Sequence, residues 1–156
     1  MRFLVLAVGA KQPAWVDAAF DDYAARMPRE ARVELVRIKP EARGAGSAVA
    51  RALARESERI AAALPRDCER VALDEAGEQY SSVAFSRRVE RWLGAGRDVA
   101  FMIGGADGLA PDLKRAAHAR LSLSAFTLPH GLVRVLLAEQ LYRAASILRN
   151  HPYHRA

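Results

Sequence analysis

Short apolar runs alternate along this chain with longer segments in which apolar residues recur at helical spacing. Residues 3–8 are continuously apolar and end at Gly9, which is typical of a buried parallel strand. Four further short runs predict strands, at 33–38, 70–73, 99–103 and 121–123. The pattern therefore predicts a chain in which strands and helices follow one another in turn.

The segments between these runs predict helices. Ser81 or Ser82 can cap the third helix, and Gly94 and Gly96 can end it. Strands that alternate with helices predict an α/β fold, with a mostly parallel sheet of five to six strands and helices on both faces. No linker or repeat divides the chain, so residues 1–156 are expected to form one domain. The predicted helices span about 13–27, 47–64, 81–93, 111–119 and 132–149.

The last predicted helix is apolar over an unusually wide arc. Leu136, Leu137, Leu141 and Leu148 exceed what one core-facing stripe requires. In a chain of this size, the second apolar side could be covered by another copy of the same chain. The helix therefore predicts a homodimer.

Composition indicates a globular protein with a positive net charge. Hydrophobic residues make up 51% of the chain, charged residues 27%, and the formal net charge is +6. Nearly all of the positive charge is arginine, whose guanidinium group suits phosphate oxygens. A nucleic-acid partner is one interpretation, and a genome rich in arginine and alanine codons is the other.

Two basic segments could contact a nucleic-acid backbone. Arg51, Arg55 and Arg59 are four residues apart along one predicted helix. The loop 39–47 before this helix is basic and rich in glycine. Each segment could equally be a solvated surface. The loop's relevant residues are Lys39, Arg43, Gly44 and Gly46.

The sequence contains few signals of cellular compartment or membrane association. Cys68 is the single cysteine, which excludes an internal disulfide and fits a reducing cytoplasm. The apolar run 3–8 is too short for a signal or membrane segment. We therefore expect a cytoplasmic protein without membrane association.

Three segments are expected to meet at one ligand site. In open α/β sheets, ligands bind beyond the carboxyl ends of the strands. Leu73 and Asp74, Gly104 and Gly105, and the segment 121–130 all follow predicted strands. The last segment carries hydroxyl groups before Pro129, and it is either a loop that holds a small molecule through backbone groups or an ordinary connection. The glycines match neither a dinucleotide fingerprint nor a phosphate-binding loop.

Other candidate chemistry is weaker. No Gly-x-Ser-x-Gly elbow marks a hydrolase nucleophile. His151 and His154 are three residues apart without a suitable third ligand, so no metal is expected. Arg143 follows Glu139 by four residues, which predicts either a structural ion pair or a functional guanidinium.

Together, four motifs resemble one family. They are Ile103-Gly-Gly-x-x-Gly108, the segment 123–130 with Arg134, Leu141-Tyr-Arg143, and the terminal Tyr153-His-Arg155. This ordered set, extending from Val5 to the last residues, resembles the RlmH family. Its members are SPOUT-class methyltransferases that modify a pseudouridine of large-subunit ribosomal RNA.

The resemblance implies more than the pattern of residues does. It implies a SPOUT-type fold with a C-terminal trefoil knot, a homodimer, and S-adenosylmethionine as cofactor without a metal. It implies N3-methylation of a pseudouridine in helix 69 of 23S rRNA, on the assembled ribosome. The implied cofactor contacts are Leu73, Gly104, Leu123, Ser124, Ala125, Phe126, Thr127 and Leu128.

The chemistry of that reaction suggests roles for the C-terminal residues. Because the N3–H of pseudouridine is a weak acid, a group must accept its proton. His154 is the candidate base or proton relay, with Arg143 and Tyr153 positioning the nucleotide. Three alternatives remain: a tRNA substrate, a non-catalytic RNA-binding protein, and a flavodoxin-like module, for which the segment 9–13 offers only one glycine.

Overall fold

The computed structural model describes residues 1–9, 11–44 and 48–155. Within these ranges, five strands form one parallel sheet in the order β2-β1-β4-β3-β5. The strands are β1 (Arg2–Val8), β2 (Arg32–Ile38), β3 (Glu69–Glu78), β4 (Val99–Ile103) and β5 (Ala119–Leu121). The helices are α1 (Ala14–Ala25), α2 (Ala48–Ala63), α3 (Ser82–Ala95), α4 (Pro111–Ala116) and α5 (His130–Leu148), and the 3₁₀ turns are η1 (Arg29–Ala31) and η2 (Pro152–His154).

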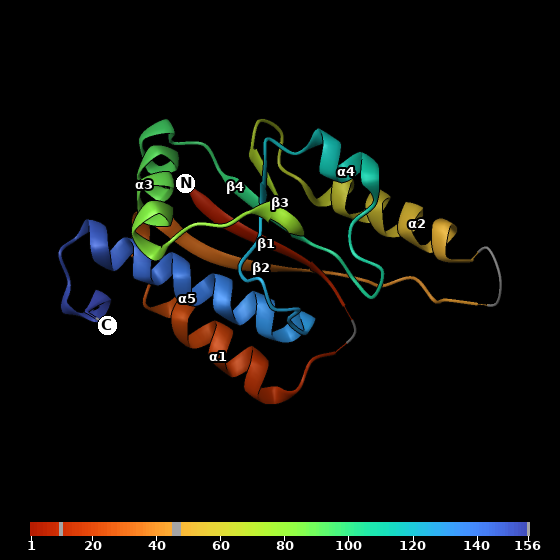
Figure 1. Cartoon of the computed structure of the whole chain (residues 1–156), viewed down its shortest axis with the longest axis horizontal. Coiled ribbons are helices and arrows are strands. Elements are labelled where there is room, and N and C mark those ends of the chain that lie inside the picture. Colours follow the sequence, from red (N-terminus) through yellow and green to blue (C-terminus); the bar gives the residue numbers. More distant parts are fainter. Residues whose placement is uncertain (10, 45–47, 156) are drawn as a thin grey trace.

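Helices cover both faces of the sheet, as the alternating pattern predicts (Figure 1). Side chains of β1 alternate between two cores because successive residues of a strand point to opposite faces. Phe3 packs in one core with Phe20 of α1, Trp92 of α3 and Leu137 of α5. Leu4, on the other face, packs in a second core together with residues of α2 and α4. The predicted fold class is therefore confirmed.

Two strands differ from their predicted bounds. β3 extends to Glu78, although the residues after Leu73 have no apolar pattern. The extension is held by pairing with β5, whose register on β3 shifts between Leu73 and Glu78. At Gly77 the two backbones are so close that a Cβ atom would lie 2.7 Å from the carbonyl carbon of Leu121. β5 itself ends at Leu121 rather than at 123.

The helix ends follow the expected signals closely. The Ser81 hydroxyl caps α3 by accepting the Ala84 N–H at 3.1 Å, and Gly96 ends it in the left-handed region with φ 69°. Gly94 remains inside α3, and α4 ends at Ala116, three residues early. Gly46 of the predicted basic loop and Ser47 at the predicted start of α2 lie outside the described residues. The trefoil knot stays a prediction.

The leucines of α5 divide between the core and the surface. Leu137 and Leu141 are fully buried in the core that this chain forms by itself. Leu136 and Leu148 are half-buried. Because the chain's own sheet and helices cover two of the four leucines, their number alone does not require a second copy. The homodimer stays a prediction.

Candidate active site

A cavity of about 390 Å³ lies where β3, β4 and β5 end and α5 begins. Parallel strands place their carboxyl ends at one edge of the sheet, so segments far apart in sequence meet there. All three predicted segments contribute to its lining. The lining residues are Leu73, Asp74, Glu75, Ile103, Gly104, Ala106, Asp107, Gly108, Leu109, Lys114, Leu121, Ser122, Leu123, Ser124, Phe126, Leu128, His130 and Val133.

Most of the predicted cofactor contacts line this cavity. The two exceptions are Ala125 and Thr127, and both are exposed. Phe126 lines the cavity and is also 82% exposed, an unusual position for a large aromatic side chain. The predicted contacts that do line the cavity are Leu73, Gly104, Leu123, Ser124, Phe126 and Leu128.

The hydroxyl groups of the loop 122–129 shape the loop itself. Ser122 is buried, and its hydroxyl donates to the carbonyl oxygen of Ser124 at 3.0 Å. The Ser124 hydroxyl accepts the N–H of Phe126 at 2.9 Å. These bonds fix the turn that carries Phe126 to the mouth of the cavity. The hydroxyls of Ser122 and Ser124 thus have partners within the loop.

Gly104 permits a close approach of two backbone segments. A Cβ atom there would overlap the backbone of Gly108 and lie 2.6 Å from the N atom of Leu109. The turn is closed by a bond of 3.1 Å from the N–H of Gly108 to the carbonyl of Gly105. Gly108 has φ 74°, a conformation that favours glycine. The glycines are thus required by the turn of the loop.

Charged residues at the cavity were only partly foreseen. Asp74 follows Leu73 and lies 3.6 Å from Lys114 Nζ and 3.8 Å from Arg120 Nη1. Glu75, Asp107 and Lys114 also line the cavity and were not singled out from sequence. The available signal was that Asp107 lies inside the Gly-Gly-x-x-Gly segment. The cavity therefore combines apolar walls with three carboxylates and one ammonium group.

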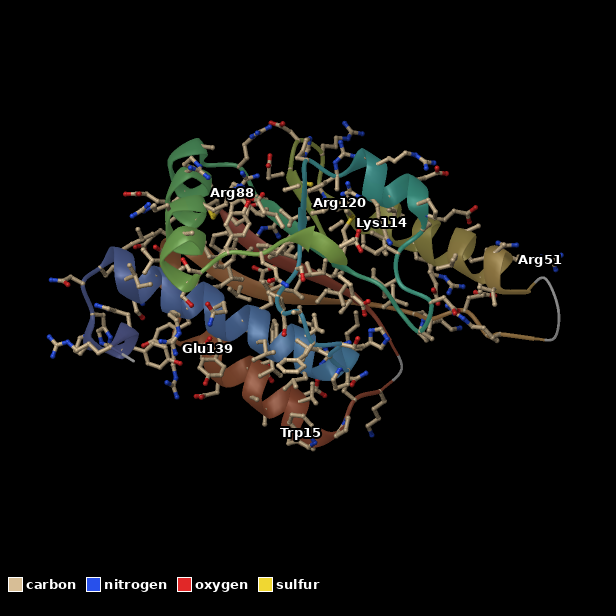
Figure 2. All side chains as sticks on the ribbon, in the orientation of Figure 1. Trp15, Arg51, Arg88, Lys114, Arg120 and Glu139 are labelled. Atoms are coloured by element: carbon tan, nitrogen blue, oxygen red, sulfur yellow. The ribbon has the colours of Figure 1, made fainter. Side chains whose placement is uncertain are left out.

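The C-terminal candidates form a separate cluster at the other end of α5. The Tyr153 hydroxyl donates to Glu139 Oε1 at 3.0 Å, and Arg143 Nε donates to the same oxygen at 2.9 Å. The Tyr153 ring lies 4.5 Å from that of Tyr142 between centroids, and the Arg143 guanidinium lies 5.1 Å from the Tyr153 centroid. Figure 2 labels Glu139, which lies midway along α5. The predicted ion pair of Arg143 with Glu139 is confirmed.

These contacts anchor the C-terminal segment to α5, although the segment contains no apolar run. Tyr153 is half-buried and η2 packs on α5. Burial, followed by hydrogen bonding to Tyr23 and Glu139, raises the pKa of Tyr153, so its phenol stays protonated. Nδ1 of His154 is buried and has no hydrogen-bond partner among the described residues. We call Glu139, Tyr142, Arg143, Tyr153 and His154 the tail cluster.

A second cavity of about 340 Å³ lies beside the tail cluster. Arg26 and Arg149 line it, together with His151 and the ring of Tyr142. The Arg26 guanidinium also lies 5.8 Å from the Tyr142 ring centroid. Cationic side chains next to an aromatic ring are suited to a phosphate and an adjacent base.

The cavity at the strand ends and the tail cluster are separate within a single copy. Val133 of α5 lines the cavity, whereas Arg143 of the same helix belongs to the tail cluster. These two residues are ten positions apart, which is about 15 Å along the helix at about 1.5 Å per residue. Side chains this far apart along a helix do not contact one another.

Arg134, which belongs to one of the motifs, lies in the interior. It is 2% exposed, and its Nε has no hydrogen-bond partner among the described residues. Burial is the main cause that lowers the pKa of its guanidinium. A Cβ atom at Gly9 would lie 3.2 Å from its Nη2, so glycine there leaves room for this side chain.

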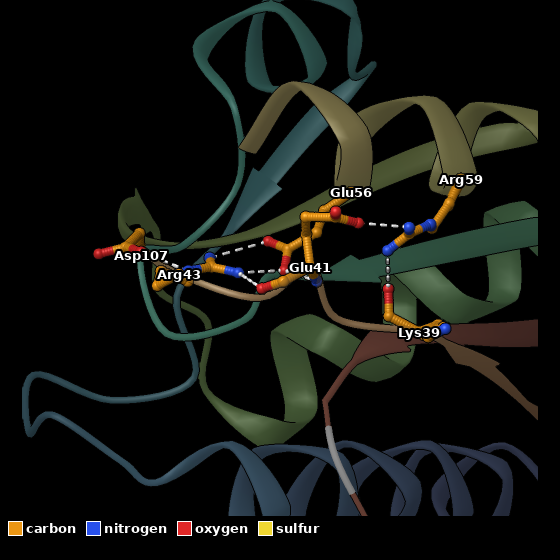
Figure 3. A network of polar contacts seen from close by, with 6 residues as sticks. All are labelled: Lys39, Glu41, Arg43, Glu56, Arg59 and Asp107. Atoms are coloured by element: carbon orange, nitrogen blue, oxygen red, sulfur yellow. Dashed lines mark hydrogen bonds and ion pairs between the residues drawn. The ribbon is translucent and has the colours of Figure 1, made fainter. Parts of the chain in front are cut away.

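The basic segments are less available to RNA than the sequence indicated. Arg59 binds Glu41 and donates to the carbonyl of Lys39 at 2.8 Å. Arg43 is held by Glu56 and Asp107 (Figure 3). Arg51 and Arg55 are exposed. The stripe of α2 is thus partly an internal ion-pair network.

No helix in the ranges given above has the length and apolarity that a membrane crossing needs. The same part of the chain has no group of three or more histidine, cysteine or acidic side chains arranged to hold a metal ion.

Comparison with known proteins assigns the family. Residues 1–154 match the family described as "Predicted SPOUT methyltransferase". The chain belongs to the SPOUT methyltransferase family. Ribosomal RNA large subunit methyltransferase H of Nitrosospira multiformis is 56% identical over 156 residues, 100% of both chains. The protein of the same name from Burkholderia cenocepacia is 54% identical, also over 100% of both chains.

A solved structure supports the same SPOUT fold. A candidate RNA methyltransferase from Bacillus anthracis matches with a TM-score of 0.50 and 14% sequence identity. The match covers 97% of this chain and 96% of that chain. At this identity the likeness concerns the fold alone. The family resemblance inferred from the motifs is confirmed by the sequence relatives.

Proposed function

We propose that this protein transfers a methyl group from S-adenosylmethionine to N3 of a pseudouridine in helix 69 of 23S rRNA, on the assembled ribosome in the cytoplasm. Full-length relatives at 56% and 54% identity carry the name of a large-subunit ribosomal RNA methyltransferase. The single observation that carries the proposal is the cavity at the strand ends, where segments from three parts of the chain meet.

The cavity fits S-adenosylmethionine in size and chemistry. Its volume of about 390 Å³ falls within the roughly 300–1,000 Å³ of small-molecule pockets. Leu73, Leu123 and Leu128 offer apolar walls, and Asp74 and Glu75 offer carboxylates for the cationic groups of the cofactor. When bound, the cofactor supplies an activated methyl group on a sulfonium. Gly104 and the 123–128 loop would hold it through their backbones.

The tail cluster is proposed to handle the target nucleotide. Tyr153, with its phenol protonated, cannot act as a base, but its ring and the Arg143 guanidinium can orient a uracil-like ring. His154, next to Tyr153 in the tail cluster, is proposed to accept the N3 proton or to pass it to water. Arg26 and Arg149, at the neighbouring cavity, pair with Asp22 and Glu30, but both are exposed and can add a contact to phosphate.

A complete site then requires a second copy of the chain. Methyl transfer needs the acceptor nitrogen in line with the methyl group, within about 3–3.5 Å of it. In one copy, Val133 at the cavity and Arg143 in the tail cluster are ten residues apart on α5, which is about 15 Å along the helix. We propose a homodimer in which the tail cluster of one copy faces the cofactor cavity of the other. The exposed rings of Trp15 and Phe126 are candidate contacts of that interface.

The proposal is tested by mass spectrometry of RNA from a strain that lacks this protein. We expect the modified nucleotide of 23S rRNA to lose one methyl group, and expression of the intact chain to restore it. The control is the same strain expressing a chain with His154→Ala and Arg143→Ala. Loss of methylation from tRNA with 23S rRNA unchanged would contradict the proposal.

A further inference from the structure

A three-residue ionic network connects α2 to the cofactor cavity. Arg43, in the segment between β2 and α2, donates to both carboxylate oxygens of Glu56, at 2.5 Å and 3.0 Å. Its Nε donates to Oδ2 of Asp107 at 3.0 Å. In Figure 3 the Arg43 guanidinium lies between the carboxylates of Glu56 and Asp107. One planar cation therefore joins three segments of the chain.

Glu56 is the buried carboxylate that anchors this network. Its side chain is 3% exposed, and its Oε2 also accepts the N–H of Glu41 at 2.9 Å. A buried carboxylate is stable only where its oxygens are paired. Burial by itself would raise the pKa of Glu56, but the hydrogen bonds from Arg43 and from the Glu41 N–H outweigh it and lower that pKa. The ion pair with Glu56 therefore fixes the position of Arg43.

The other end of the network is the glycine loop of the cavity. Asp107 lies between Gly105 and Gly108 and lines the cavity. The same loop packs closely against Glu56 and Val8. A Cβ atom at Gly105 would lie 3.6 Å from Glu56 Oε1 and 3.0 Å from Val8 Cγ1. The loop has few side chains that could hold its conformation. The ion pair of Asp107 with Arg43 connects the loop to another segment of the chain.

We propose that Arg43 is a positioning residue for the cofactor: by binding Asp107 from its fixed place on Glu56, it holds the 104–108 loop in the conformation that receives S-adenosylmethionine. The inference rests on the proposed function for the identity of the ligand. The basic loop that contains Arg43 had suggested a contact with a nucleic-acid phosphate. In this proposal Arg43 binds Asp107 instead. A guanidinium is needed because it presents several donors in a rigid fork, which one ammonium group cannot do.

The test measures cofactor affinity and loop exchange separately. Asp107→Asn leaves Arg43 on Glu56, so the protein should fold with an unchanged melting temperature. We expect its Kd for S-adenosylmethionine, measured by calorimetry, to rise by about two- to fivefold, the range for a partly exposed ion pair. In the cofactor-free protein, the amides of 104–108 should exchange faster with deuterium. Asp107→Glu should restore both properties.

A direct contact of Asp107 with the cofactor is distinguished by Arg43→Lys, which leaves the Asp107 carboxylate in place. Positioning predicts that Arg43→Lys weakens binding as Asp107→Asn does, and that the double variant is no weaker than either one. Unchanged binding by Arg43→Lys, or additive losses in the double variant, would overturn the inference.

The matched control is Asp112→Asn, which removes the exposed ion pair with Arg115 on α4. It should change neither affinity nor exchange. If the wild type bound no S-adenosylmethionine, the proposed function would fail. Exchange at 104–108 would then decide the inference alone: unchanged exchange in Asp107→Asn overturns it, and faster exchange supports it.

Discussion

The Tyr153 hydroxyl donates a hydrogen bond of 3.0 Å to Glu139, which joins the C-terminal turn to the middle of α5. The same oxygen of Glu139 accepts the Arg143 Nε. Two of the three proposed catalytic residues are therefore held by one carboxylate. A segment that is polar in sequence is thus part of the folded structure, and we expect its removal to lower stability.

A chain that ends at Asn150 should fold, bind S-adenosylmethionine and fail to methylate RNA. The loss of the Tyr153 contacts should lower its stability by about 1–2 kcal/mol, from one hydrogen bond and one aromatic pair. Cofactor affinity should be unchanged because the cavity lies at the other end of α5. Thermal melts, calorimetry and a ribosome methylation assay check these expectations. Wild-type methylation by the truncated chain would exclude the tail cluster from the active site.

Gly104→Ala should weaken cofactor binding and destabilise the fold together. The reason is the close approach of the Gly108 backbone, which a Cβ atom would overlap. Gly94→Ala is the matched control, because a Cβ atom there meets nothing within 4 Å and the residue is helical. That control should stabilise the protein by about 0.5–1 kcal/mol. Equal melting temperatures for the two variants would show that the loop accommodates the added atom.

Glu56 should make stability depend on pH on the acid side. Its pKa is lowered in the folded state from the ordinary value of 4.5. The stability that it contributes is therefore complete above pH 4.5 and is lost as the pH falls through the folded-state pKa. Melting temperatures of wild type and Glu56→Gln, measured from pH 7 down to about pH 3, should converge as the pH falls. A constant difference over that range would contradict the assignment.

Phe126→Ala should reduce cofactor affinity without destabilising the chain. Phe126 lines the cavity but is 82% exposed, so its truncation removes little buried surface. We expect a change in unfolding free energy within about 0.5 kcal/mol, as for other surface substitutions. Val83→Ala, at an exposed position on α3 that does not line the cavity, is the control. Calorimetry with S-adenosylmethionine distinguishes the two, and equal affinities would exclude a role for the ring.

The elements that sequence predicted well are those whose own residues determine them. β1 and β4 are short apolar runs bounded by polar residues or glycine, and their bounds agree with the prediction to within one residue. The end of β3 could not be predicted, because residues after Leu73 remain in the strand only through pairing with β5. Tertiary pairing, rather than local pattern, determines that boundary.

The candidate site divides in the same way. The convergence of Leu73, Gly104 and the 123–128 loop follows from one rule about strand ends, and the cavity confirms it for most of these residues. The network of Arg43 with Glu56 and Asp107 could not be foreseen, because its partners lie 13 and 64 residues away. Sequence spacing indicates contacts within one helix, such as that of Arg143 with Glu139. It does not indicate contacts between segments that are distant in sequence.

The strand order also determines when the sheet can be completed during synthesis. In the described chain, β4 is the strand that contacts both β1 and β3. Until Ile103 has been made, β3 can have no neighbour, and one edge of β1 stays open. The first half can pair β1 with β2, but the central strand that unites the sheet arrives late and pairs over a long sequence separation. Folding rate should therefore be limited by the docking of β4, and a stalled nascent chain would expose an apolar strand edge.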